Sequence, residues 1–230
     1  PVIQDGQTTR TWGGMTFIVH ASCGGSMSNA LYGIDGCWWG LRVRPEVYNL
    51  FDPADPRGSY FYTSGQTVAI ANISNFTDGV AAPKFQNVTS TGSAGSNSTH
   101  VDTDFPMFRL GDAYLMYAEA HLRGGGGTAQ QALDFVNELR VRAYGDSSAV
   151  ITAPELDLDF ILEERSRELL WEGHRRTDLV RYGRFTGNAY IWTFKGGVQA
   201  GQQTAAHLDL YPIPESQLAA NPNLTQNPGY

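Results

Sequence analysis

The spacing of apolar residues divides the chain into an early part without helical periodicity and a later helical part. Short runs of strand-forming residues before residue 106 predict strands at Thr16 to His20, Val68 to Ile73 and Lys84 to Val88. A short helix is predicted from Pro45 to Phe51, because proline suits the first helical turn. The Ser-, Thr-, Gly- and Asn-rich segment from Thr89 to His100 offers almost nothing to bury, which predicts a mobile surface loop.

Two helices separated by a run of glycines are predicted after residue 106. Gly111 to Leu122 has apolar residues at helical spacing, and Gly124 to Gly127 supplies a left-handed C-cap. Thr128 is the expected N-cap of the second helix. Because alanines on both helices allow close approach, the pair resembles one tetratricopeptide-type hairpin, a unit that needs stacked neighbours for stability. The apolar positions of the two helices are Leu115, Ala118, Leu122, Ala132, Val136, Leu139 and Ala143.

A third helix is predicted to start at the capping box of Thr152 and Glu155. Arg165 and Glu172 fall on its leucine-rich stripe, which predicts that both are buried and paired. Gly173 then interrupts, and helix is expected to resume from Asp178 to Tyr182. The expected partners of the buried pair are Arg140, Glu168, Arg175 and Asp178.

These elements predict an α+β fold that is mainly helical. We expect a loop-rich region with short strands over residues 1–105 and a helical region over residues 106–230. A hydrophobic content of 41% with 17% charged residues is an ordinary globular balance.

The charge of the chain excludes one class of partner. A net charge of −7 and a pI near 5.1 argue against nucleic acid, which requires clustered Lys and Arg. No stretch is apolar over the length that spans a bilayer. Cys23 and Cys37 lie in a Gly/Ser-rich stretch and are either a disulfide or two small buried thiols.

Catalysis is not the preferred interpretation of the carboxylates. Glu164, Glu168 and Glu172 are spaced i, i+4, i+8 and share one helix face, as a glycosidase pair could. Interleaved arginines, however, lower the pKa of a carboxylate, which opposes what a general acid requires. Structural ion pairing is therefore predicted, with no catalytic residue and no cofactor.

Metal binding is also disfavoured. The five histidines are scattered, with no pair at helical ligand spacing. Asp52 and Asp55 near Arg57 could be calcium ligands, but Asp-Pro turn chemistry explains them more simply. No metal site is predicted.

Four stretches, taken in order, resemble one known family. They are WWGLRVRPEVYNLFDPADPRG (38–58), FRLGDAYLMYAEAHL (108–122), ILEERSRELLWEGHRRTDLVRYGRF (161–185) and LYPIPESQLAANPNLTQNPGY (210–230). In this order they resemble the C-terminal half of SusD/RagB-type proteins, outer-membrane lipoproteins that capture glycans at the surface of Bacteroidetes.

The resemblance implies a non-catalytic glycan-binding protein that delivers oligosaccharides to a TonB-dependent SusC-type transporter. Pro1 to Arg10 carries no basic start, apolar run or lipid-accepting cysteine. We therefore expect the signal, the lipid anchor and most helical repeats to lie in an N-terminal half outside this chain. Two alternatives stay open: a protein-interaction scaffold and, behind it, a glycoside hydrolase.

Aromatic residues in loops are the candidate glycan contacts. Sugars stack their apolar faces on flat rings, and binding sites combine such walls with a few polar groups. Trp12, Tyr32, Trp38 and Trp39 lie in Gly-, Ser- and Asn-rich sequence and are the predicted contacts. On an extended chain, adjacent Trp38 and Trp39 would point in opposite directions.

Overall fold

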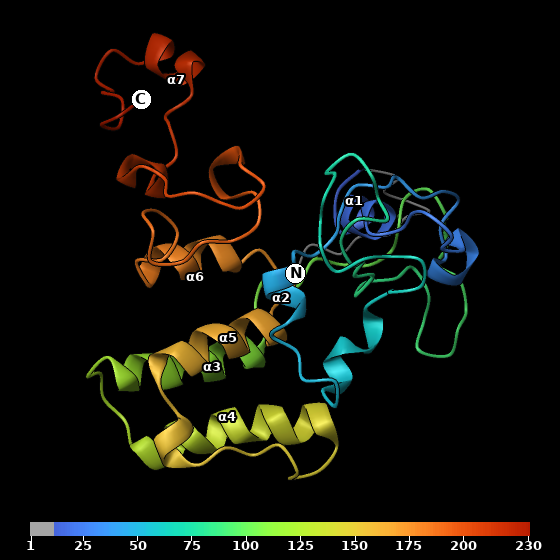
Figure 1. Ribbon diagram of the computed structural model, residues 1–230, viewed down its shortest axis with the longest axis horizontal. Helices are drawn as coiled ribbons and strands as arrows, with labels where there is room; N and C mark the ends of the chain where they lie inside the picture. Colours follow the sequence, from blue (N-terminus) through green and yellow to red (C-terminus); the bar gives the residue numbers. More distant parts are fainter. Residues whose placement is uncertain (1–11) are drawn as a thin grey trace. The chain divides into compact units, whose positions relative to one another are not determined.

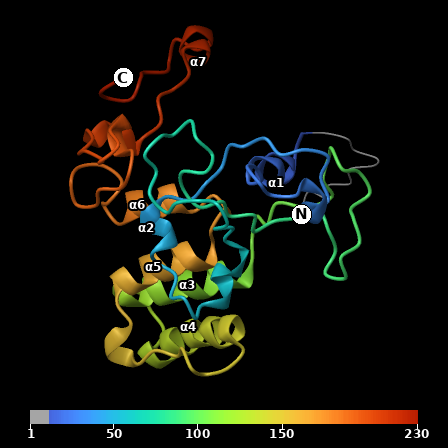
Figure 2. The ribbon, with the colours of Figure 1, turned by 45° about the vertical axis from the view of Figure 1, so that its right-hand side comes forward.

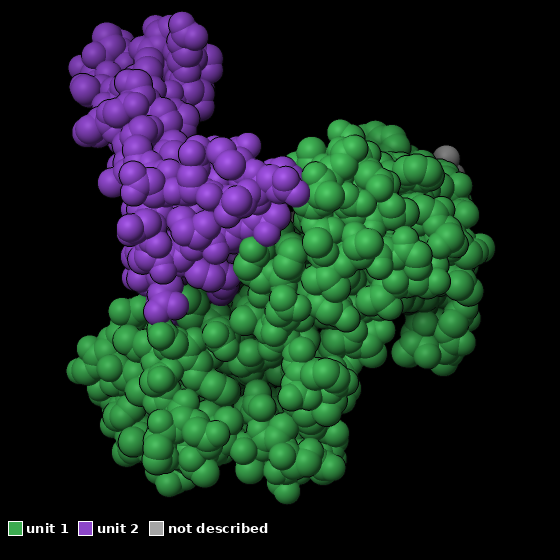
Figure 3. Space-filling model, viewed as in Figure 1, with its two compact units in different colours: residues 1–174 green, residues 175–230 purple. Residues whose placement is uncertain are grey.

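The protein consists of two compact units, residues 1–174 and 175–230, coloured separately in Figure 3. The computed structural model describes residues 12–230. The segment Pro1 to Arg10 lies outside the described residues. Each unit is treated by itself below.

The loop-rich part of unit 1 contains short helices and no strand among its described residues. Helix α1, Thr16–Ala21, occupies the segment predicted as the first strand, so that prediction was wrong. The physical reason is that Met15, Val19, Cys23 and Met27 recur every four residues and are all buried in one apolar cluster. The other short helices here are η1 (Asn29–Tyr32), α2 (Pro45–Tyr48) and η2 (Pro56–Tyr60).

The other two predicted strands are also absent, and described residues pair only as isolated bridges, such as Val43 with Val80 and Val88 with Ala94. In the segment from Val68 to Ile73, the carboxylate of Asp78 accepts the backbone N–H groups of Ala71 and Asn72 at 3.0 and 2.7 Å. A side chain therefore satisfies donors that a neighbouring strand would otherwise bond.

Three helices form the helical part of unit 1 (Figures 1 and 2). Helices α3 (Leu110–Leu122) and α4 (Ala129–Tyr144) form the predicted hairpin, with Ala118 and Ala132 fully buried where the helices meet. The side chain of Thr128 caps α4 as predicted, by accepting the N–H of Gln131. The mainly helical character is confirmed.

Helix α5, Leu158–Glu168, packs against α3 and starts later than predicted. The capping box of Thr152 and Glu155 is present but closes the 3₁₀ turn η3, Ala153–Glu155. Asp157 is the N-cap of α5 itself, accepting the N–H of Phe160 at 2.7 Å.

Unit 2 begins with helix α6, Arg175–Arg181, and ends with α7, Glu215–Ala220. Between them the chain forms loops with two 3₁₀ turns, η4 (Lys195–Gly197) and η5 (Ala206–Asp209). Within residues 12–230, no helix combines the length and apolar character needed to cross a membrane.

Candidate functional site

Three aromatic side chains lie together on the surface of unit 1, and we call Trp12, Phe17 and Trp38 the aromatic platform. The ring centroids of Trp12 and Trp38 are 5.7 Å apart, and those of Phe17 and Trp38 are 6.3 Å apart. Trp12 is 63% exposed and Trp38 is 43% exposed. The structure therefore brings two predicted contact residues together and adds Phe17, from helix α1, which the sequence analysis missed.

The Trp38 ring of the aromatic platform packs on a buried side chain. The Trp38 indole stacks on the buried imidazole of His20, with centroids 4.5 Å apart and planes inclined by 19°. The ring nitrogens of His20 lie 2.8 and 3.0 Å from the carbonyl oxygens of Gly36 and Thr99, which fixes the ring plane. The stacking on His20 therefore holds the Trp38 ring in place, although Trp38 lies in a loop.

A disulfide between Cys23 and Cys37 ties the platform loop to the end of α1. Trp38, directly after Cys37, also donates its backbone N–H to the His20 carbonyl at 3.0 Å. The disulfide alternative of the sequence analysis is thus the one present in the structure. Since a crosslink restricts the unfolded chain, it stabilises this loop without an extended core.

The other two predicted contacts lie apart from the platform. Trp39 is 60% exposed, and its ring lies 6.3 Å from that of Phe76. The expected alternation of Trp38 and Trp39 is wrong, because Trp39 has a φ of +60° and the chain is not extended there. Tyr32 is half-buried against the apolar cluster around α1, and this burial raises the pKa of its hydroxyl.

The end of the polar segment from Thr89 to His100 packs beside the platform. The His100 ring lies 4.6 Å from that of Trp12, and both Thr99 and His100 are half-buried. Asn87 anchors the segment by donating to the carbonyls of Gly33 and Asn97. The expectation that this segment buries nothing is wrong at its end, because the His100 ring packs on Trp12 and the Thr99 carbonyl contacts the His20 ring.

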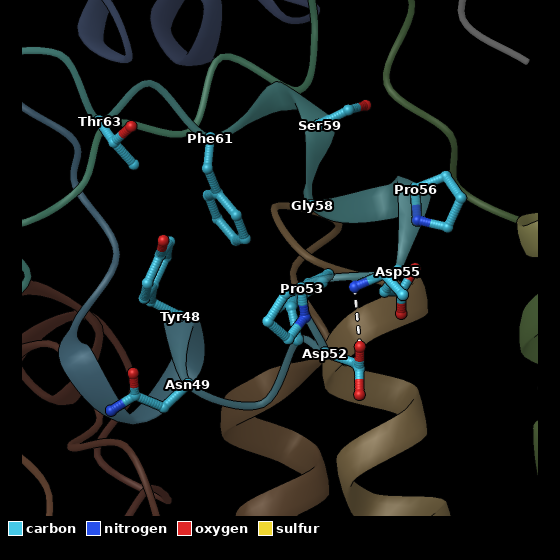
Figure 4. A pocket seen from close by; sticks show the side chains of 12 residues that line it. Tyr48, Asn49, Asp52, Pro53, Asp55, Pro56, Gly58, Ser59, Phe61 and Thr63 are labelled. Carbon is cyan, nitrogen blue, oxygen red and sulfur yellow. Dashed lines mark hydrogen bonds between the residues drawn. The ribbon is translucent and has the colours of Figure 1, made fainter.

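A hollow of unit 1, with a volume of about 600 Å³, lies between α2 and η2 (Figure 4). Its wall contains the rings of Tyr48, Phe51 and Phe61, and Figure 4 shows the Phe61 ring between Tyr48 and Pro53.

The two aspartates that line this hollow, Asp52 and Asp55, already accept hydrogen bonds from neighbouring residues. Asp52 accepts the Ala54 N–H, while Asp55 accepts the backbone N–H of Arg57 and pairs with its guanidinium at 2.7 Å. The turn interpretation of these acids is confirmed. In the described part of the chain, no group of three or more His, Cys, Asp or Glu side chains could hold a metal ion.

Arg57, from η2, also takes part in a buried ion network with the acids of α5. Glu164, fully buried, pairs with Arg57 at 2.8 Å, Arg140 at 3.1 Å and Arg167 at 2.8 Å. Burial by itself raises the pKa of the Glu164 carboxyl, but the arginines outweigh it and lower the pKa. The carboxylate is therefore held ionised.

Glu168, the next acid of the network, follows the same pattern. Glu168 pairs with Arg57, Arg109 and Arg142 at 3.1, 2.7 and 2.7 Å. Burial raises the pKa of the Glu168 carboxyl, but hydrogen bonds and charge from Arg109 and Arg142 lower it to about 2. Since a general acid needs a raised pKa, Glu164 and Glu168 are unsuited to acid catalysis.

The predicted burial of Arg165 and Glu172 is confirmed, and within unit 1 both residues pair with side chains that the sequence analysis did not name. Glu172 pairs with Lys84 at 2.6 Å and Arg109 at 2.5 Å, while Arg165 pairs with Asp112 at 2.8 Å. Lys84, Arg109 and Asp112 come from segments 53 to 88 residues away in the sequence. Helical spacing reveals which acids are buried, whereas only the fold reveals what they contact.

Comparison with known proteins identifies the family. The SusD family model matches residues 28–230. This chain belongs to the SusD family. It is 46% identical over 158 residues to the starch-binding protein SusD of Bacteroides thetaiotaomicron, covering 69% of this chain and 27% of that protein.

Solved structures agree with the sequence comparison. A SusD superfamily protein from Bacteroides vulgatus matches with a TM-score of 0.60 at 28% identity, covering 87% of this chain and 42% of that one. A laminarin-binding SusD-like protein matches with a TM-score of 0.59 at 27% identity, covering 86% and 40% respectively. The chain thus has the SusD-like fold and spans less than half the length of these relatives.

Proposed function

We propose that this chain contributes to a cell-surface protein that binds oligo- or polysaccharides without cleaving them. The observation that carries the proposal is the aromatic platform, where two exposed indoles lie together and that of Trp38 is held by His20 and by the disulfide of Cys23 and Cys37. Rigid flat rings stack on sugars at a low entropic cost. The names of two relatives, a starch-binding and a laminarin-binding protein, support carbohydrate as the ligand class.

The experiment is affinity electrophoresis of the chain through gels containing soluble starch or laminarin. Trp12→Ala and Trp38→Ala should each weaken binding roughly 5- to 150-fold, taking base-to-ring stacking of about 1–3 kcal/mol as the proxy. Phe108→Ala is the matched control, because Phe108 is 90% exposed on another part of unit 1. If both tryptophan variants bind the polysaccharide as tightly as wild type does, the glycan contact lies elsewhere.

The absence of catalysis is part of the same proposal. The ionised, arginine-paired state of Glu164 and Glu168 supports it, since neither can donate a proton at neutral pH. Incubation with maltooligosaccharides and laminarin oligosaccharides should leave their lengths unchanged. Shortened products, absent from a Glu168→Gln control, would contradict the proposal.

The proposed context is the outer membrane of a Bacteroidetes cell, with attachment through a lipid anchor. There the protein would pass bound saccharides to a SusC-type TonB-dependent transporter. Family membership supports both statements. Co-purification of the full-length protein with a neighbouring SusC-type gene product tests the partnership, and recovery of the protein without it from detergent-solubilised membranes would contradict it.

A further inference from the structure

Unit 2 contains a hollow of its own, with a volume of about 330 Å³. This volume lies near the lower end of the range of about 300–1,000 Å³ for small-molecule sites, so it suits a single ring. Two cationic side chains, Arg176 and Lys195, line it together with a wall of aromatic rings. The rings are Phe185, Trp192, Tyr211 and Tyr230.

Arg176 is held in a fixed plane. Its guanidinium carbon lies 3.8 Å from the Tyr211 ring centroid and 4.7 Å from that of Phe185. Its Nη2 donates to the carbonyls of Leu208 at 2.9 Å and Asp209 at 3.1 Å. Its Nε and Nη1 groups have no acceptor among residues 12–230, so each has an N–H group that a ligand oxygen can accept.

Lys195 is a buried cation with spare donors. The residue is only 2% exposed, and its Nζ lies 4.5 Å from the Trp192 ring centroid. Nζ donates to the Tyr190 carbonyl at 2.6 Å, which uses one of the three N–H groups of an ammonium. In the described part of the chain the other two have no acceptor. Buried charges are normally paired, so an anion would complete this arrangement.

The charge balance of unit 2 also favours binding of an anion. Its residues include five Lys and Arg against three Asp and Glu, whereas the whole chain has a net charge of −7. Burial lowers the pKa of the Lys195 amine, and the charge of Asp209 opposes this shift. Asp209 also accepts the Thr186 hydroxyl, and one acid does not balance two cations.

We propose that this hollow binds an acidic monosaccharide unit, with the carboxylate of a hexuronate held by Arg176 and Lys195. The flat apolar face of the sugar would lie against the aromatic wall. The choice of a sugar over other carboxylates rests on the glycan function proposed above. The site itself stands on residues of unit 2 that take no part in the aromatic platform.

The composition of the chain offers a direct probe, because it has two lysines, Lys84 and Lys195. In protein labelled with [6-¹³C]lysine, titration with sodium D-glucuronate should shift the Lys195 signal and leave that of Lys84 unchanged. D-Glucose, the matched neutral ring, should not shift it. Acetate, the carboxylate without a ring, should require at least about tenfold higher concentration.

Variants separate this site from the platform. Arg176→Gln and Lys195→Met should each weaken glucuronate binding by about tenfold or more in calorimetry. Trp38→Ala should leave it unchanged, whether or not that variant loses neutral glycans. The proposal is overturned if glucuronate gives no Lys195 shift, if glucose or acetate binds equally well, or if folded Arg176→Gln binds as wild type does.

Discussion

Replacing Glu164 with alanine is the sharpest test of the ion network. The carboxylate has no exposed side-chain surface and bonds Arg57, Arg140 and Arg167. Its removal leaves three largely buried guanidinium groups with fewer partners. Breaking a buried pair by removing one member typically costs about 3–5 kcal/mol.

The contacts that the three arginines keep determine where the stability loss falls between about 3 and 5 kcal/mol. Arg57 keeps its pair with Asp55, and Arg167 keeps a bond to the Leu50 carbonyl. Arg140 keeps a bond to a backbone carbonyl and stacks over the ring of Phe160. We therefore expect a loss near the lower end, about 3 kcal/mol, which is a large fraction of an ordinary stability of about 5–15 kcal/mol.

The neighbouring residue provides a matched control. Glu163 lies on the same helix, is 52% exposed and has one carboxylate oxygen 3.6 Å from Arg167. Glu163→Ala should cost at most about 0.5 kcal/mol, because exposed pairs at this spacing contribute little. Urea unfolding of wild type and both variants, followed by circular dichroism and by tryptophan fluorescence, measures the difference. A loss below about 1 kcal/mol for Glu164→Ala, or equal losses for both variants, would refute the reasoning.

Three further predictions concern the same unit. Glu172→Ala should cost about 3 kcal/mol in urea unfolding, since it leaves the Lys84 ammonium with carbonyl partners and without its carboxylate. A midpoint equal to wild type would show that the carboxylate is not needed. The double change of Cys23 and Cys37 to serine should cost about 2–4 kcal/mol, with a lowered melting temperature as the readout. Because the folded pKa of Glu168 is lowered to about 2, its stabilisation is complete above its ordinary pKa and is lost as pH falls towards 2. Unfolding midpoints at pH 7, 4 and 2.5 should therefore fall more steeply for wild type than for Glu168→Gln.

The sequence predicted the helices of unit 1 well where the signal was local. Helices α3 and α4 follow from apolar spacing, glycines and the Thr128 cap, which act within a few residues of each other. Helix α1 was missed because the β-branched residues around Ile18 and Val19 favour a strand locally. The longer spacing of its buried residues, Met15 to Met27, was the signal that could have revealed it.

The candidate site was predictable in part. Gly- and Ser-rich sequence around Trp12 and Trp38 indicated exposed rings, and the structure places these two together. Phe17 and His20 were hidden by the strand prediction, since on a strand they would have occupied different faces. The partners of the buried acids, such as Arg57 with Glu164, are 107 residues apart, and no local pattern encodes such a pair.

The platform and the ion network rely on different physical devices, and this separates binding from stability in the experiments above. The platform depends on a crosslink, on backbone hydrogen bonds and on the support of His20 beneath Trp38, so its exposed rings can be removed with little loss of packing. The network joins η2, α4 and α5 through charges that are buried and mutually paired, so removing one member leaves its partners unsatisfied. A platform variant that lost stability as Glu164→Ala does would show that Trp38 belongs to the core. A network variant that lost glycan binding while remaining fully folded would move the site towards the hollow between α2 and η2.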